Sequence, residues 1–243
     1  MANDGYNLAI ETSGRVGSIS LGRGDVLLAT EPLPQKQRHN IDLVPVMAAV
    51  FDRYGLKPSQ LEQVYISTGP GSFTGLRIAV ATVKMLALAG DVKIVDVPTL
   101  DVVASNAPAE HEHVAVGLNL KRDTLWSGIY HRRGDGILEL VGEAKLMTMA
   151  QLLSQSPRPV AVLGDPLPPL SDLPAGMMNG VTVLPASLSK PASESLWHLG
   201  RIRSMQGRYI EAGQLLPLYA RSPEAVLLWN ERKRKSSTQS VVK

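Results

Sequence analysis

Hydrophobic and polar residues alternate in three short runs near the start of the chain. The runs span residues 6–12, 18–21 and 26–30, and Gly22-Arg23-Gly24-Asp25 separates the last two. Alternation with a period of two predicts strands, and a glycine-rich tetrapeptide between two such runs predicts a hairpin turn. We therefore expect the chain to open with three strands.

Helical spacing follows and then alternates with strands. A helix is predicted from Asn40 to about Tyr54, because apolar side chains recur on one face of it: Val44, Met47, Val50, Phe51 and Tyr54. The next predicted elements are a strand at 64–68, a helix at 76–89, a strand at 94–97 and a helix after Thr99. Three strands that lead into strand–helix alternation are typical of an α/β lobe with a mixed sheet, and not of an all-parallel one.

The second half of the chain repeats this series. Strands are predicted at 114–120, 125–130, 137–141, 160–163 and 181–184, with helices at 148–154 and 193–206, and Ser193 is expected to cap the last helix. The recurrence predicts two lobes, residues 1–107 and 108–225. The helix at 193–206 is a candidate to pack back on the first lobe.

The composition is that of a protein with a packed core. Of 243 residues, 44% are hydrophobic and 19% are charged, which excludes a disordered chain. Cysteine is absent, so disulfides and cysteine metal sites are excluded, and a cytoplasmic location is expected. No apolar run approaches the roughly 20 residues that cross a membrane. Few aromatic residues, 5% of the chain, disfavour a stacking surface for single-stranded nucleic acid.

The net charge of +3 is concentrated at the end of the chain. From Trp229 onward five basic residues stand against one acidic residue, so the rest of the chain is close to neutral. Residues 226–243 are expected to form a disordered basic tail, and a weak phosphate-attracting arm is the alternative.

A glycine-rich segment precedes the predicted helix at 76–89 and reads Gly69-Pro-Gly-Ser-Phe-Thr-Gly-Leu-Arg77. Glycines there permit a sharp turn and leave helical N–H groups facing outward, which suits an anion or a close backbone contact. The spacing fits neither G-x-G-x-x-G nor a P-loop. Pro70 and Thr74 stand where a G-x-S-x-G elbow around Ser72 requires glycine, so no catalytic serine is assigned.

His111-Glu112-His113 resembles a zinc-binding helix only in part. The H-E-x-x-H spacing requires a second histidine at 115, where Ala115 stands. We expect these histidines to lie in a solvated linker, and the sequence assigns no metal or cofactor.

The predicted helix at 76–89 is apolar on nearly every side. One stripe is Leu76, Val80, Val83 and Ala87, and a second is Ile78, Thr82, Met85 and Ala89. Such a helix is covered on both sides, either within the chain or by a second polypeptide. The positions that we assign to a partner interface are Val44, Met47, Phe51, Ile78, Thr82, Met85 and Ala89.

Taken together, these segments resemble the TsaB family, also called YeaZ, over most of residues 7–225. The glycine loop Gly69–Arg77 carries the resemblance most strongly. Weaker matches are Ala9-Ile-Glu-Thr-Ser13, Arg38-His39, Val97-Pro-Thr-Leu100 and Pro217-Leu-Tyr-Ala-Arg-Ser-Pro-Glu-Ala225. The resemblance implies a two-lobed actin-like ATPase fold, related to RNase H.

The resemblance also implies a non-catalytic subunit in the synthesis of N6-threonylcarbamoyladenosine at position 37 of tRNA. Its implied partners are a TsaD-like catalytic subunit, a small TsaE-like ATPase and, when alone, a second copy of itself; tRNA is reached only through the complex. In TsaD an H-x-x-x-H pair holds a metal, and Thr99 and Val103 stand at those positions here. In the loop, Gly69, Gly71 and Gly75 would permit the turn, and Phe73 and Arg77, beside Ser72 and Thr74, would fix it.

Two departures from the family pattern concern nucleotide chemistry. Glu11 stands where the family has aspartate, and Asn119 stands where the second lobe usually opens with a carboxylate. Because carboxylates hold Mg²⁺ in phosphoryl transfer, Asn119 disfavours a kinase or ATPase. The alternative function is an ATP-dependent phosphotransferase with Glu11, Thr12 and Ser13 around the phosphates. A peptidase and a plain binding module are weaker alternatives.

Overall fold

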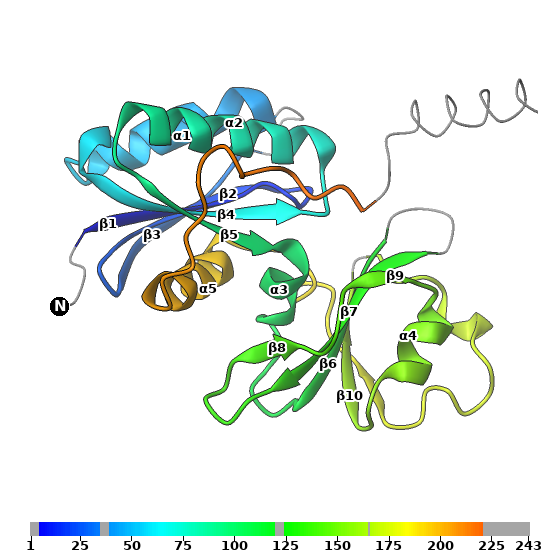
Figure 1. Cartoon of the computed structure of the whole chain (residues 1–243). Helices are drawn as coiled ribbons and strands as arrows, with labels where there is room; N and C mark the ends of the chain where they lie inside the picture. The colour runs from blue at the N-terminus through cyan, green and yellow to red at the C-terminus, as the bar shows by residue number, and fades with distance from the viewer. Residues whose placement is uncertain (1–4, 35–38, 120–123, 165, 221–243) are drawn as a thin grey trace, which may run out of the picture.

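The computed structural model describes residues 5–34, 39–119, 124–164 and 166–220. Within them the strands form two sheets, one in each half of the chain (Figure 1). The first has five strands in the order β3-β2-β1-β4-β5. Its strands are β1 (Tyr6–Glu11), β2 (Ser18–Arg23), β3 (Val26–Pro32), β4 (Leu61–Gly69) and β5 (Lys93–Pro98).

The first sheet is mixed, as the alternation pattern predicts. β1, β2 and β3 pair antiparallel, whereas β4 pairs parallel with both β1 and β5. Parallel neighbours need a crossover, and helices supply both crossovers. These helices are α1 (His39–Arg53), with a 3₁₀ turn at Pro58–Gln60, and α2 (Phe73–Ala89).

The second sheet has the order β11-β10-β6-β7-β8, with β9 also paired to β7. Its strands are β6 (His113–Asn119), β7 (Leu125–Arg132), β8 (Leu138–Leu140), β9 (Lys145–Met147), β10 (Val160–Leu163) and β11 (Val181–Val183). α4 (Met149–Gln155) packs on this sheet through Leu152 and Leu153, and a 3₁₀ turn covers Leu170–Asp172. β9 was not predicted from the sequence, whereas the equally short β8 and β11 lie within predicted strands.

Helices cover both faces of the first sheet (Figure 1). α1 and α2 pack on one face, where Leu8, Ile10, Val64 and Ile66 form a core with them. α5 (Ser193–Met205) packs on the other face, with Trp197 and Leu196 against Ala9 and Tyr65. α3 (Thr99–Ala104) lies between the two sheets, with side chains in the cores of both halves.

The chain returns to the first sheet after completing the second. α5 contacts β1, β2, β4 and β5, so the helix predicted at 193–206 lies on the first sheet. The prediction that Ser193 caps it is wrong. Ala192 is the cap position, and the buried Ser193 hydroxyl instead shares a hydrogen bond with Ser20 Oγ at 2.8 Å.

The segment after α5 also lies against the first sheet. Ile210 N donates to Ile94 O on β5 at 2.9 Å, and Leu218 N donates to Thr68 O at the end of β4 at 2.7 Å. Leu215, between them, is fully buried in the core that α1 and α2 share. Residues 210–220 therefore end next to the glycine loop. The predicted basic tail, 226–243, lies outside the described residues, and none of the described helices is long and apolar enough to cross a membrane.

Candidate partner-binding surface and glycine loop

The glycine loop packs against the turn that follows β1. Ser72 N donates to Ser13 O at 2.7 Å, and Thr12 Oγ1 donates to Gly75 O at 2.9 Å. A Cβ atom added at Gly71 would lie 2.3 Å from Ser13 O, and one at Gly75 would lie 2.1 Å from Thr12 O. Glycine is required at both positions because two backbone segments approach too closely for a side chain.

Ser72 is the N-cap residue of α2. Its Oγ accepts a hydrogen bond from Gly75 N at 3.2 Å, which is the usual role of a serine at the start of a helix. The helix therefore begins at Phe73, three residues before the predicted start. Gly69 ends β4 in the left-handed region, with φ of 108°. Of the two uses that the sequence suggested for this loop, the structure supports the close backbone contact.

Glu11, Thr12 and Ser13 face the interior. Glu11 and Thr12 are fully buried and Ser13 nearly so. Glu11 Oε1 accepts hydrogen bonds from Ser13 N at 2.6 Å and from Ser13 Oγ at 2.5 Å. Burial raises the pKa of the Glu11 carboxyl, and the hydrogen bonds from Ser13 oppose that rise only in part. These three residues lie buried beneath the turn, and Glu11 Oε2 has no hydrogen-bond partner among the described residues.

The inner sides of α1 and α2 include several residues predicted to contact a partner. Met47, Phe51 and Thr82 are buried, and Ile78 packs against the same core. The assignment of Met47, Phe51 and Thr82 to a partner interface is therefore corrected to the intramolecular core, whereas Ile78 is only partly buried. α2 is apolar on nearly every side, so the hydrophobic pattern did not determine which stripe faces the sheet.

The outer side of this helix pair is apolar and exposed. Val44, Met85 and Leu88 are 54%, 69% and 85% exposed. We define the α1–α2 outer surface as Val44, Pro45, Ala48, Ala81, Met85, Leu88 and Ala89, all of them exposed. Ala81 and Leu88 were missed in the sequence, because the outward stripe of α2 is displaced by one residue from the predicted one, and Pro45 and Ala48 of α1 were missed as well. Val44, Met85 and Ala89 were predicted.

A second exposed apolar patch lies at the start of α2. The rings of Phe73 and Tyr219 stack with centroids 5.1 Å apart, and the Arg77 guanidinium lies 5.2 Å from the Phe73 centroid. Leu216 and Leu218 are exposed in the same C-terminal segment. We call Phe73, Leu216, Leu218 and Tyr219 the loop patch.

Thr99 and Val103, which stand at the metal-ligand positions of TsaD, begin and continue α3. Both side chains are buried, and Val103 belongs to the hydrophobic core of the second half. Valine has no donor atom and a single threonine hydroxyl is a poor ligand, so this helix is not equipped to hold a transition metal. Asn119, at the end of β6, donates from Nδ2 to Pro166 O at 3.4 Å.

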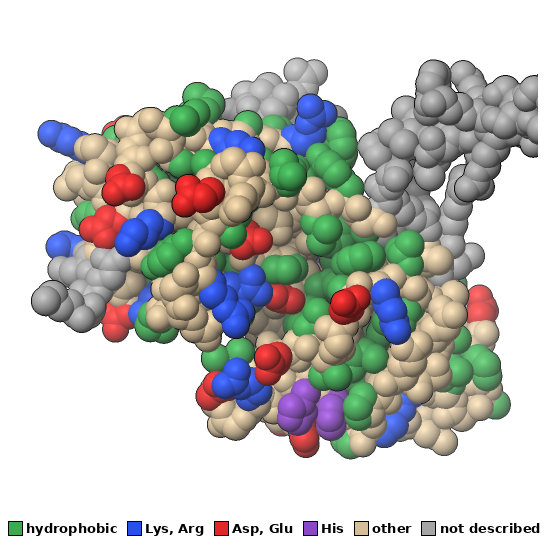
Figure 2. Space-filling view, in the orientation of Figure 1, with side chains coloured by type: hydrophobic (Ala, Val, Ile, Leu, Met, Phe, Trp, Pro, Cys, Tyr) green, Lys and Arg blue, Asp and Glu red, His purple; other side chains and the backbone are tan. Residues whose placement is uncertain are grey.

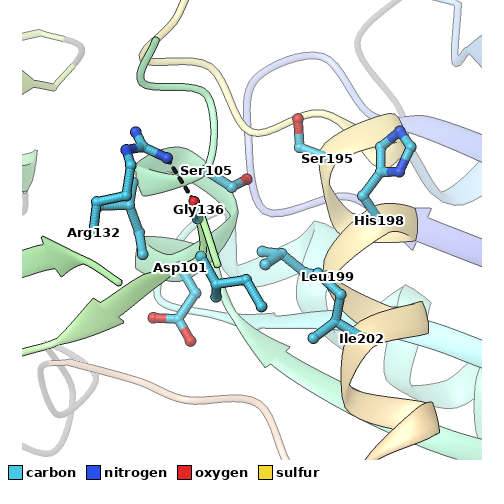
Figure 3. A pocket seen from close by; sticks show the side chains of 10 residues that line it. Asp101, Ser105, Arg132, Gly136, Ser195, His198, Leu199 and Ile202 are labelled. Atoms are coloured by element: carbon cyan, nitrogen blue, oxygen red, sulfur yellow. Dashed lines mark hydrogen bonds between the residues drawn. The ribbon is translucent and has the colours of Figure 1, made fainter. Parts of the chain in front are cut away.

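A cavity of about 260 Å³ lies where α3, α5 and the β7–β8 hairpin meet (Figure 3). Its charged groups are engaged within the protein. Asp101 accepts hydrogen bonds from Tyr130 Oη at 2.7 Å and from Arg203 at 2.5 Å. Burial raises the pKa of Asp101 despite the Arg203 charge. Ser195, which lines the cavity beside His198, donates its hydroxyl to Asn106 Oδ1 at 2.6 Å, so it is not paired with a base.

Comparison with known proteins gives consistent matches. The family model described as "TsaD: tRNA N6-adenosine threonylcarbamoyltransferase" matches residues 29–162, more than half of the chain. The chain is 27% identical to the tRNA threonylcarbamoyladenosine biosynthesis protein TsaB of Bacillus subtilis, covering 93% of this chain and 99% of that protein. It is 22% identical to the Escherichia coli protein of the same name, covering 88% and 94%.

Solved structures agree with these matches. YeaZ from Pseudomonas aeruginosa superimposes with a TM-score of 0.72 at 26% identity, over 88% of this chain and all of that one. A second Pseudomonas aeruginosa structure, described as similar to peptidase YEAZ, gives a TM-score of 0.73 at 25% identity, over 89% of this chain and all of that one. The predicted α/β architecture, with a mixed sheet and helices in each half of the chain, is present in the structure, and the fold is that of the YeaZ structures. The chain belongs to the TsaB (YeaZ) family, within the group of sequences that the TsaD model describes, and its curated relatives are named for tRNA threonylcarbamoyladenosine biosynthesis.

Proposed function

We propose that this chain is a non-catalytic subunit of the complex that forms N6-threonylcarbamoyladenosine at position 37 of tRNA. In this proposal it docks a TsaD-type catalytic protein on the α1–α2 outer surface. The observation that carries the proposal is the exposure of Met85 and Leu88, at 69% and 85%, on a helix whose opposite side is packed into a lobe. Burial of exposed apolar area of this kind by a partner stabilises the complex, because the area is removed from water.

The composition of the outer surface supports a helix as the partner element. Ala48, Ala81 and Ala89 are small, and small residues allow helix axes to approach to roughly 8–10 Å. Met85 is flexible and adapts to an uneven counter-surface. A family model named for TsaD matches this chain. A TsaD-type protein would therefore carry an equivalent helix pair, which allows a pseudo-symmetric pairing of like surfaces. When alone, two copies of this chain would pair by the same surface.

The buried state of Glu11, Thr12 and Ser13 supports a scaffold over the phosphotransferase alternative. A phosphotransferase needs carboxylates and hydroxyls directed at a nucleotide and its Mg²⁺. Here Glu11 is fully buried with Oε1 accepting hydrogen bonds from Ser13, and the Thr12 hydroxyl donates to Gly75 O. In the proposal, ATP is consumed by other members of the complex, among them a small TsaE-like ATPase, and tRNA is reached only through the complex.

The test is co-expression of the chain with the TsaD-type protein of the same host, together with an ATPase assay on the isolated chain. We expect co-purification of the wild type and no turnover by the chain alone. The variant Met85→Glu/Leu88→Glu should lose the partner, and Val141→Glu should retain it. Val141 is a matched control because it is an apolar residue, 57% exposed, in the second half of the chain. Turnover without association would support the phosphotransferase instead.

A further inference from the structure

Two histidines that are 18 positions apart in the chain face each other at the edge of the second sheet. His113 begins β6 and is directly opposite His131 on β7. Arg132 N donates to Glu112 O at 2.8 Å. Glu112 and Arg132, the neighbouring pair along the two strands, are therefore a hydrogen-bonded pair. His113 and His131 are then a non-hydrogen-bonded pair, the kind whose side chains lie closest in an antiparallel ladder. Their ring centroids are 5.2 Å apart.

Glu112 completes a three-residue cluster. Its Oε1 lies 3.8 Å from His131 Nδ1, and the ligand atoms of Glu112, His113 and His131 all lie within 4.8 Å of one another. The side chains of His131 and Glu112 are 46% and 67% exposed, so both are free to adjust. Figure 2 shows histidine side chains side by side on the surface of the second half of the molecule, next to an acidic one.

His113, the least exposed residue of the cluster, has a ring nitrogen without a hydrogen-bond partner among the described residues. This atom, Nδ1, is buried. Leaving a buried polar atom unpaired is costly, and such atoms in native proteins usually have a partner that includes water or an ion. The cluster thus combines one fixed imidazole with two adjustable ligands.

We propose that Glu112, His113 and His131 bind one transition metal ion of the zinc class. Imidazole nitrogens with a carboxylate suit Zn²⁺ and its neighbours, whereas Mg²⁺ and Ca²⁺ prefer sets of oxygen ligands. With bonds of about 2.0–2.1 Å, tetrahedral ligand atoms stand roughly 3.3 Å apart, so the two exposed side chains need to close by only about 1.5 Å. Three protein ligands leave one position for water or for a group from another molecule.

The ion would strengthen the junction between the two halves of the chain. Arg132, next to His131, donates hydrogen bonds at 3.0 Å to the carbonyl oxygens of Ala107, Pro108 and His111. The segment that leads from the first half into β6 is therefore already attached to the end of β7. A metal ion on Glu112 and His113 would add a second attachment at the same place. This site does not depend on the proposed partner function.

The test is a titration of the untagged full chain with Zn²⁺ by calorimetry, with Mg²⁺ as the control ion. The chain has five histidines, and the two outside the cluster that lie among the residues with described side chains, His111 and His198, provide matched control variants. We expect one Zn²⁺ per chain, a rise in the melting temperature with Zn²⁺, and no response to Mg²⁺. His131→Ala and His113→Ala should weaken binding by more than the roughly 10–100-fold that loss of an outer-shell group costs. His111→Ala and His198→Ala should bind as the wild type does.

The proposal is overturned if the wild type takes up no Zn²⁺, if His131→Ala binds within twofold of the wild type, or if His111→Ala loses as much affinity as His131→Ala. Should His113→Ala fail to fold, His131→Ala decides alone, because its side chain is half-exposed and its removal leaves no cavity. Uptake of several ions that none of the variants reduces would mean adventitious surface binding, and would also overturn the site.

Discussion

The glycine-loop end of α2 and the residues that α2 contributes to the α1–α2 outer surface lie on one helix, yet they differ in what their side chains contact. At the loop end, polar groups are paired within the chain: Ser72 caps the helix and Thr12 donates to Gly75 O. On the outer surface, apolar groups such as Met85 and Leu88 remain exposed. Polar groups that already form hydrogen bonds within the fold have few donors or acceptors available to a ligand. Exposed apolar area, in contrast, lowers the free energy of a complex when a partner removes it from water. This contrast is why we place the function on the outer surface.

The largest effect is expected on the outer surface. Met85→Glu/Leu88→Glu would bury two uncompensated charges in an apolar interface, at a cost of about 3–5 kcal/mol, which is more than 100-fold in the dissociation constant. Because both side chains are exposed in the free chain, the melting temperature should change little. Calorimetry with the TsaD-type protein and a thermal melt measure the two quantities. Equal loss for Val141→Glu would contradict the location of the interface.

The next largest effect is expected at the loop end. Gly75→Ala places a Cβ atom 2.1 Å from Thr12 O, so the backbone must shift, and we expect a loss of about 1–3 kcal/mol in the free energy of unfolding. Urea unfolding measures it. Gly134→Ala is the control, because nothing lies within 4 Å of a Cβ atom there. A Gly75→Ala protein as stable as Gly134→Ala would show that the loop does not need its close contact.

A smaller effect is expected from the buried carboxyl beneath the loop. The raised pKa of Glu11 means that the folded chain holds this proton more tightly than the unfolded chain does. Its contribution to stability therefore falls as the pH rises from its ordinary pKa of 4.5 to the higher folded-state value. Glu11→Gln removes the buried charge and keeps an acceptor for Ser13, so stability at pH 7 should rise by on the order of 1 kcal/mol.

The measurement for Glu11→Gln is the free energy of unfolding as a function of pH. Its profile should be flatter than that of the wild type above the ordinary pKa, whereas exposed Glu143→Gln should leave the profile unchanged. A variant that is less stable at neutral pH would instead mean that the ionised Glu11 is stabilised in the fold, and that it is available to interact with a cation.

The smallest effect is expected in the loop patch, at the start of α2. Tyr219→Ala removes a ring that stacks on Phe73 at 5.1 Å, and the loss in stability should be about 0.5–1.5 kcal/mol. Leu216→Ala, at a more exposed residue of the same segment, should cost less. Thermal melts distinguish the two. If the order were reversed, the stacked pair would not hold the C-terminal segment in place.

The sequence predicted the elements better than it predicted their orientation. The alternating runs at the start of the chain and the strand–helix order of the first half are present in the structure, because short-period patterns report local burial directly. α2 is different. It is apolar all round, so the periodicity did not determine which stripe faces the sheet, and Thr82 was assigned to the outside although it is buried.

Features that depend on distant segments could not be predicted. His113 and His131 meet because β6 and β7 pair in one register, and the motif His111-Glu112-His113 does not extend to a residue 18 positions beyond His113. The packing of residues 210–220 against β4 and β5 likewise depends on contacts with residues more than 100 positions earlier. The register between β6 and β7 and the packing of residues 210–220 on the first sheet depend on the whole fold, and no local sequence pattern encodes them.

The most direct test of the central claim is reconstitution of the modification from purified components. The wild-type chain, the TsaD-type protein and the small ATPase are combined with tRNA, ATP and the remaining substrates, and N6-threonylcarbamoyladenosine is measured by mass spectrometry of the digested tRNA. We predict product with the wild type, none when the TsaD-type protein is omitted, and none with Met85→Glu/Leu88→Glu. Full product formation by that variant, or product from the chain without the TsaD-type protein, would contradict the account.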